Sequence, residues 1–135
     1  MLVAYDVALD LIRALRPVVE QLRKHSRDAA DQVERAASSI VLNLAEGERR
    51  RGRDPGRFYD MAHGSAGEIL GALDLADAWG WQVEGQQARA LLDRELGLLW
   101  GLTRRSRDAR AVSHEGGDRL PKRARRIPEA VDRTP

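Results

Sequence analysis

The residues of this 135-residue chain best suited to chemistry are its three histidines and the carboxylates beside them. Asp60 and His63 are three residues apart, a spacing that puts a carboxylate and an imidazole on one face of a helix, as in a di-iron bundle. A di-iron centre needs two such pairs and carboxylates from two further helices. His25 and His114 stand in no similar pattern. We therefore expect no metal and no cofactor, and interpret His63 as a polar residue at a helix–helix or subunit boundary.

A second possible chemistry is RNA cleavage. Arg57 and His63 fit the R-x(4–6)-H spacing of HEPN-type ribonucleases, which are helical bundles. Arg107 and His114 fit it as well, and roughly one or two matches are expected by chance in a chain so rich in arginine. The chain also contains no cysteine, which excludes a thiolate nucleophile. The sequence therefore argues against an enzyme, and a HEPN-like ribonuclease is the least favoured of three functions.

Arginine clusters are the remaining chemical feature. Of the 23 basic residues only Lys24 and Lys122 are lysines, and a planar guanidinium suits phosphate or carboxylate, although a GC-rich genome would give the same bias. The residues that we predict to bind a nucleic-acid backbone are Arg49, Arg50, Arg51, Arg53, Arg57, Arg104, Arg105, Arg123, Arg125 and Arg126. A solvated loop and a tail kept soluble by charge explain these clusters equally well.

The charge is distributed unevenly along the chain. The formal net charge is +2, but residues 1–103 carry 13 basic and 16 acidic side chains, whereas residues 104–135 carry 10 and 5. An acidic body is therefore followed by a basic tail. No aromatic residue stands in this tail, so base stacking cannot be its way of binding nucleic acid.

Hydrophobic residues recur at intervals of three and four, which predicts helices over residues 2–24 and 27–50, a third from the Asp54-Pro55 pair to Gly80, and a fourth from about Glu84. Ser26 and Asp54 are predicted N-caps, and Pro55 then stands at the first position of the third helix. Pro17 either kinks the first helix or ends it and lets another begin. The residues expected to be buried are Ala4, Ala8, Leu11, Leu15, Val18, Leu22, Ala30, Val33, Ala37, Ile40, Leu44, Phe58, Ala62, Ser65, Ile69, Ala72, Ala76, Ala88, Leu91, Leu92, Leu98, Leu99 and Leu102.

These segments define the expected fold class. No segment alternates with period two, so we predict an all-α, antiparallel up-down four-helix bundle in residues 1–110. Residues 111–135 are rich in arginine and poor in apolar residues, which is typical of a disordered tail. No apolar stretch approaches the roughly 20 residues of a membrane span, and the N-terminus lacks the features of a signal peptide. We expect a cytoplasmic protein with no membrane partner and no small-molecule substrate.

Two linked motifs in the middle of the chain contain more pattern than a bundle requires. The first runs from Arg35 to Gly47 and reads RAASSIVLNLAEG, and the second comprises Phe58, Ala62-His63-Gly64-Ser65 and Glu68. Together they resemble the family of 23S rRNA-intervening-sequence proteins, four-helix bundles that include the accessory variability determinant of diversity-generating retroelements. The resemblance covers roughly Tyr5 to Leu102, with departures at Leu44 and His63, and does not extend to the tail.

The resemblance implies a homopentamer that acts as a non-catalytic adaptor. Its partners would be RNA or DNA, and a reverse transcriptase as in the retroelement member of the family. Trp79, Trp81 and Trp100 are the candidate subunit contacts. The alternative function is a protein-only assembly or interaction module that never contacts nucleic acid.

The motif residues themselves predict a structural polar network between the second and third helices. Ser39, Asn43 and Glu46 share one side of the second helix, and Ser65 and Glu68 share one side of the third. We expect Asn43 to donate to Glu68 and to accept from Ser65. Small residues are expected to let the two helices approach closely, namely Ala36, Ala37, Ala45, Gly64 and Gly67.

Overall fold

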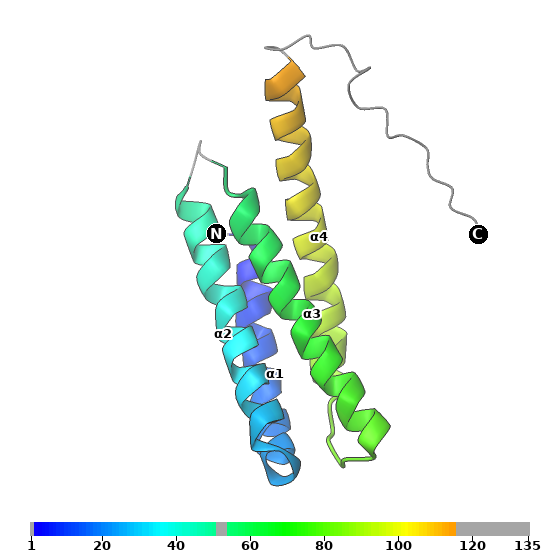
Figure 1. Ribbon diagram of the computed structural model, residues 1–135. Coiled ribbons are helices and arrows are strands. Elements are labelled where there is room, and N and C mark those ends of the chain that lie inside the picture. Colours follow the sequence, from blue (N-terminus) through cyan, green and yellow to red (C-terminus); the bar gives the residue numbers. More distant parts are fainter. Residues whose placement is uncertain (1, 51–53, 116–135) are drawn as a thin grey trace, which may run out of the picture.

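The computed structural model describes residues 2–50 and 54–115, which form four antiparallel helices (Figure 1). They are α1 (Val3–His25), α2 (Arg27–Arg49), α3 (Gly56–Trp79) and α4 (Gln86–Glu115). No strand occurs in these two ranges. The predicted all-α bundle is confirmed, and α1, α2 and α3 begin and end within about two residues of the expected positions. In the same ranges no helix is both long and apolar enough to cross a membrane.

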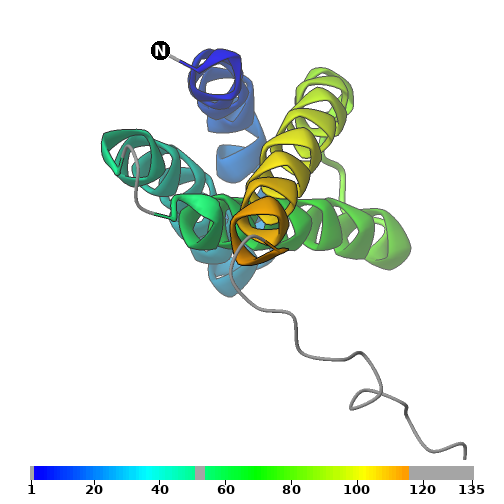
Figure 2. The same ribbon diagram turned by 90° about the horizontal axis from the view of Figure 1, so that it is seen from above.

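Each helix packs against its two neighbours in the order α1, α2, α3, α4 and back to α1, as the view from above shows (Figure 2). The core between them is built from the apolar stripe of each helix. Leu11 and Leu22 of α1, Ile40 of α2, Ile69 of α3 and Leu99 of α4 are all fully buried. The face between α1 and α2 therefore lies on the opposite side of the bundle from the face between α3 and α4.

The helix ends follow from local residues. Ser26 separates α1 from α2, and its hydroxyl accepts a hydrogen bond from the backbone N–H of Ala29 at 3.1 Å, as predicted for an N-cap. Asp54 was expected as the N-cap of α3, but α3 begins one residue later than that predicts: Pro55 is the N-cap, and Asp54 accepts from the N–H of Gly56 at 3.1 Å. Gly80 ends α3 with φ of 77°, a conformation that glycine adopts without steric cost.

Two helix boundaries were open or differ from the prediction. Of the two outcomes left open for Pro17, the structure shows a continuous α1, so the helix does not end there. The fourth helix continues to Glu115, five residues beyond the predicted boundary of the bundle, and its last turns project past the other helices (Figure 1). The predicted disordered tail from residue 116 onward lies outside the described residues.

The close approach of α2 to α3 depends on a glycine of the first motif. A Cβ atom on Gly47 would lie 2.6 Å from Cε1 of Tyr59, whose ring is buried in the core. Burial also raises the pKa of the Tyr59 hydroxyl. Gly64 and Gly67 were expected to let α3 approach α2 closely, and this prediction is wrong. Both are exposed, with open space where a Cβ would stand, so they face away from α2.

These contacts predict opposite effects for two glycine substitutions. Gly47→Ala should lower the free energy of unfolding by about 1–3 kcal/mol, because the new methyl group overlaps the Tyr59 ring. Gly67→Ala should raise it by about 0.5–1 kcal/mol, because alanine is the better helix former and meets no neighbour. Urea unfolding followed by circular dichroism measures both. Equal effects of the two substitutions would contradict the packing described for Gly47.

Candidate nucleic-acid interface and polar network

Antiparallel packing brings arginines from three helices to one end of the bundle. Arg49 and Arg50 end α2, Arg57 stands in the first turn of α3, and Arg104 and Arg105 lie where α4 leaves the core. All five side chains are exposed. We refer to these five residues as the basic end. The sequence alone had left the loop and the start of the tail as separate clusters, and the fold joins them.

The arginines of the basic end are not equally available. Glu46 accepts from Arg50 at 3.0 Å and forms an ion pair with Arg49 at 3.6 Å. The side chains of Arg57, Arg104 and Arg105 make no ion pair with a carboxylate among the described residues. These three guanidinium groups are therefore the ones best placed to meet a phosphate.

An aromatic ring holds two arginines of the basic end in place. The guanidinium groups of Arg50 and Arg57 lie 4.9 and 5.1 Å from the centre of the Phe58 ring. Such cation–π contacts restrict a side chain without neutralising its charge. Phe58 therefore orients both guanidinium groups, of which that of Arg57 has no carboxylate partner among the described residues, whereas that of Arg50 is also paired with Glu46.

Carboxylates also pair with the arginines of α4 that follow the basic end. Arg107 forms an ion pair with Asp60 at 3.3 Å, and Arg110 forms one with Asp54 at 3.3 Å. These pairs fasten the projecting part of α4 to the beginning of α3. Asp60 is thus engaged with Arg107 rather than with His63.

Five of the ten predicted nucleic-acid contacts can be placed, and they are those of the basic end. The other five lie outside the described residues: Arg51, Arg53, Arg123, Arg125 and Arg126.

Three of the five predicted network residues are hydrogen-bonded to one another across the α2–α3 seam. The side-chain amide of Asn43 donates to the carbonyl oxygen of Ser39 at 2.9 Å and to its hydroxyl at 3.0 Å. The hydroxyl of Ser65, on α3, donates to the hydroxyl of Ser39 at 2.9 Å. Ser39 therefore connects the two helices, and the network is only partly buried rather than part of the core.

The other two network residues lie elsewhere. Glu46 faces the basic end and pairs with Arg49 and Arg50. Glu68 is exposed on α3, and the amide of Asn43 turns to its own helix instead of to Glu68. An asparagine four residues after a serine can reach the serine's carbonyl within one helix, which is a shorter route than crossing to the neighbour.

A fully buried carboxyl group is the site residue that the sequence interpretation missed. Glu95 of α4 lies in the core, and neither of its side-chain oxygens has a hydrogen-bond partner among the described residues. Burial raises the pKa of Glu95 to about 8, against a smaller lowering by Arg94. The group is therefore protonated and neutral at pH 7. Its position three residues after Leu92 and four before Leu99 was a usable signal, because it continues their apolar stripe.

His25, His63 and the three tryptophans show two different environments. The ring of Trp81 stacks on that of His25, with centres 5.6 Å apart, at the corner between α1 and α2. Trp79 and Trp100 are exposed, and Trp100 lies 6.4 Å from the ring of His63. In the ranges that the structure describes, no three histidine, aspartate or glutamate side chains come together as metal ligands.

The fold and its motifs define the class of protein, an antiparallel four-helix bundle whose second and third helices are joined by a serine–asparagine network. Residues 1–94 match the family model of 23S rRNA-intervening sequence proteins. The chain belongs to this family, as the two motifs had indicated. No curated protein matches the chain.

The buried carboxyl group predicts a pH dependence of stability. Unfolding returns the pKa of Glu95 from about 8 to near its ordinary 4.5, so between these values the unfolded chain releases a proton that the folded chain keeps. The free energy of unfolding should therefore fall as pH rises through this window, by up to about 1.4 kcal/mol per pH unit, and level off above it.

Urea unfolding of the native chain and of Glu95→Gln, measured at pH 5, 6.5 and 8, tests this expectation. The glutamine cannot ionise, so the variant should gain stability relative to the native chain as pH rises. Asp93→Asn, at an exposed position of α4, is the matched control, and its stability relative to the native chain should not change with pH. A constant difference between Glu95→Gln and the native chain across the three pH values would contradict an elevated pKa.

Proposed function

We propose that the protein is a non-catalytic, homo-oligomeric adaptor that binds the phosphate backbone of RNA or DNA through its basic end. The observation that carries this proposal is the convergence of exposed arginines from α2, α3 and α4 at one place. Three of them, Arg57, Arg104 and Arg105, have no carboxylate partner among the described residues. Contacts of this kind neutralise phosphate charge and do not read the bases.

Family membership supports the same proposal. The matching family model is that of 23S rRNA-intervening sequence proteins, and the resemblance described above includes a retroelement member that implies a reverse transcriptase as partner. A reverse transcriptase is accordingly a proposed protein partner of this chain. The proposed assembly is a homopentamer, by the same resemblance.

A protein-only assembly module is the second candidate, favoured by a specific observation. Glu46 forms ion pairs with Arg49 and Arg50. Asp60 and Asp54 form ion pairs with Arg107 and Arg110, respectively. These carboxylates reduce the positive potential around the basic end. A ribonuclease is the third candidate, with His63 as its proposed catalytic residue.

A gel-shift titration in increasing salt separates the first two candidates. The triple variant Arg57→Gln, Arg104→Gln, Arg105→Gln should bind a structured RNA or a DNA duplex more weakly, and the slope of log K against log salt should fall by about 2–3 if each residue meets one phosphate. The control is Arg27→Gln, Arg35→Gln, Arg94→Gln, which removes equal charge from exposed positions away from the basic end. Binding of the same RNA and DNA by a chain that lacks residues 116–135 is measured separately.

The outcomes decide between the candidates. Loss of binding in the basic-end variant but not in the control supports the adaptor. Equal losses in both variants, or no binding by the native chain, would reject the basic end as the interface and favour the protein-only module. Cleavage of the RNA that His63→Ala abolishes would replace both with the ribonuclease.

The oligomeric part of the proposal has its own measurement. Light scattering of the full chain at micromolar concentration should give five times the 15.1 kDa of one chain. A mass of 15.1 kDa would reject self-association, while leaving the nucleic-acid interface to be judged by the gel shift.

A further inference from the structure

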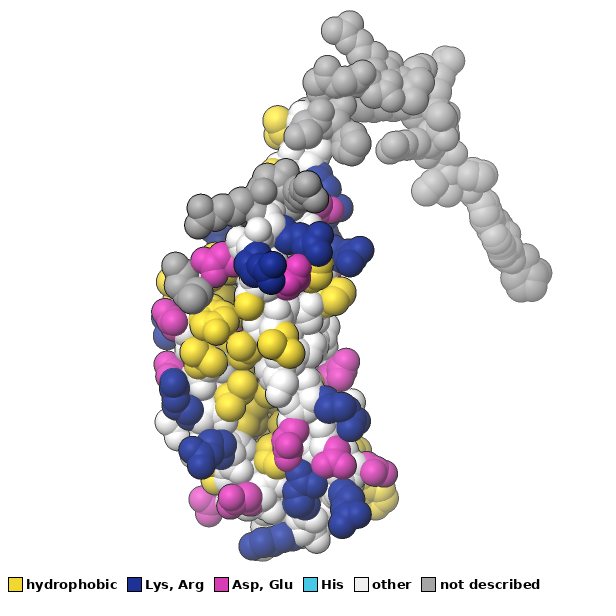
Figure 3. Space-filling view, turned by 90° about the vertical axis from the view of Figure 1, so that its left-hand side faces the viewer, with side chains coloured by type: hydrophobic (Ala, Val, Ile, Leu, Met, Phe, Trp, Pro, Cys, Tyr) yellow, Lys and Arg dark blue, Asp and Glu magenta, His cyan; other side chains and the backbone are white. Residues whose placement is uncertain are grey.

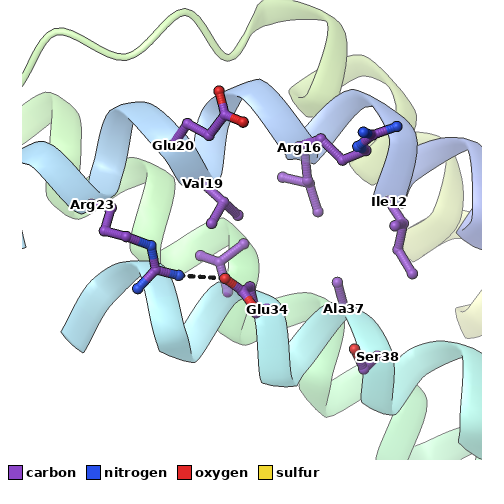
Figure 4. Close-up of a pocket in the computed structure, with 10 residues that line it drawn as sticks. Ile12, Arg16, Val19, Glu20, Arg23, Glu34, Ala37 and Ser38 are labelled. Atoms are coloured by element: carbon purple, nitrogen blue, oxygen red, sulfur yellow. Dashed lines mark hydrogen bonds and ion pairs between the residues drawn. The ribbon is translucent and has the colours of Figure 1, made fainter. Parts of the chain in front are cut away.

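An apolar groove of about 370 Å³ opens between α1 and α2. Ile12 and Val19 of α1 and Ala37 of α2 point into it, as the close-up shows (Figure 4). Ile12 and Val19 are only half-buried, so part of their apolar surface faces solvent. In the view that faces this side, apolar side chains gather along the middle of the surface with charged side chains around them (Figure 3).

The rim of the groove carries both signs of charge. Arg23 is bonded to Asp31 at 2.8 Å and to Glu34. Arg16 and Glu20 also stand on the rim and form no ion pair within the described part of the chain. Carboxylates at the rim repel phosphate, so this groove is not a continuation of the nucleic-acid interface.

The opposite side of the bundle carries a large exposed aromatic residue. Trp100 is 52% exposed, although it lies in the middle of a rigid helix. Its contact with His63 of α3, at 6.4 Å between ring centres, places it at the outer edge of the α3–α4 seam. Exposed tryptophans held on a rigid element are the residues that most often anchor an interface.

The chemistry of the groove fits an indole ring. An indole needs an apolar floor, which Ile12, Val19 and Ala37 provide. Its face attracts a guanidinium, and Arg16 stands on the rim without a carboxylate partner among the described residues. Its N–H must find an acceptor when it is buried, and the carboxylate of Glu20 is at the rim as well.

We propose that Trp100 of one copy of this chain inserts into the α1–α2 groove of a second copy. Groove and tryptophan lie on opposite sides of one bundle, so the contact is heterologous: each copy offers its groove to one neighbour and its Trp100 to another. Repetition of this contact produces a closed ring or a filament rather than a two-fold dimer. This inference rests on the proposed self-association and specifies the two surfaces that carry it.

Thiol cross-linking tests the two surfaces directly, because the chain has no cysteine of its own. Ser38→Cys stands on the rim of the groove, and Gly97→Cys stands one turn before Trp100 where a new side chain meets no neighbour. With a short bismaleimide linker, the double variant should form a ladder of covalent multimers. Each single variant should remain one chain on a denaturing gel, because like positions do not meet across a heterologous contact.

Trp100→Ala in the double-cysteine background is the decisive variant. It should abolish the ladder and shift the mass from light scattering towards a single chain, while Trp79→Ala, which removes the other exposed tryptophan, should change neither. Circular dichroism confirms that both variants stay helical.

The failures are distinguishable. A native chain that is monomeric overturns both the inference and the proposed self-association. An oligomer that gives no ladder, or a ladder that survives Trp100→Ala, overturns only the inference. Dimers formed by Ser38→Cys alone would also overturn it, because they would show a two-fold contact between grooves.

Discussion

The seam between α2 and α3 is the constraint on which the rest of the molecule depends. Gly47 leaves room for the Tyr59 ring, and Ser39 receives the hydroxyl of Ser65 from the neighbouring helix. The first contact sets how closely the two helices approach, and the second sets their register, because a shifted helix would leave polar groups without partners. With this pair of contacts in place, the end of α2 and the beginning of α3 lie close enough for Arg50 and Arg57 to meet over the Phe58 ring.

The two proposed surfaces are separated by charge as much as by distance. At the basic end, Arg57, Arg104 and Arg105 have no carboxylate partner among the described residues. Side chains of both signs stand around the α1–α2 groove, and Arg23 pairs with Asp31 and Glu34. The two proposed surfaces therefore differ in charge, as expected if one receives a polyanion and the other a protein.

Much of this arrangement could be read from the sequence. The three- and four-residue spacing of apolar residues predicted most of the core, although Leu91, Leu98 and Leu102 are only half-buried. Ser26 and Gly80 predicted two helix ends. The antiparallel order implies that the start of α3 and the end of α4 are neighbours, but the sequence analysis treated their arginines as separate clusters. Gly64 and Gly67 were misjudged because they were grouped by size, although their distance from Ala62 puts them on the outer face of α3. Residue spacing does not predict which of several nearby partners a side chain binds. The offset between the helices decides whether Asn43 bonds to Ser39 or to Glu68, and which carboxylate pairs with which arginine.

The spacing of Glu95 from Leu92 and Leu99 predicts that it is buried, but does not explain how a carboxyl group can be buried. The usual rule is that a buried charge has a partner. Burial raises the pKa of Glu95 to about 8, so the side chain is neutral at pH 7 and no charge is buried, although its oxygens have no hydrogen-bond partner among the described residues.

The projecting end of α4 has a mechanical consequence. Among the side chains that the structure describes, Thr103 is the last buried one of this helix, and the helix continues to Glu115. At 1.5 Å per residue, the residues after Thr103 lengthen the helix by about 18 Å, first along the beginning of α3 and then past it. The helix thus works as a stiff spacer whose base is tied to α3 by Arg107 and Arg110, and whatever its far end contacts is held at a set distance from the body of the bundle.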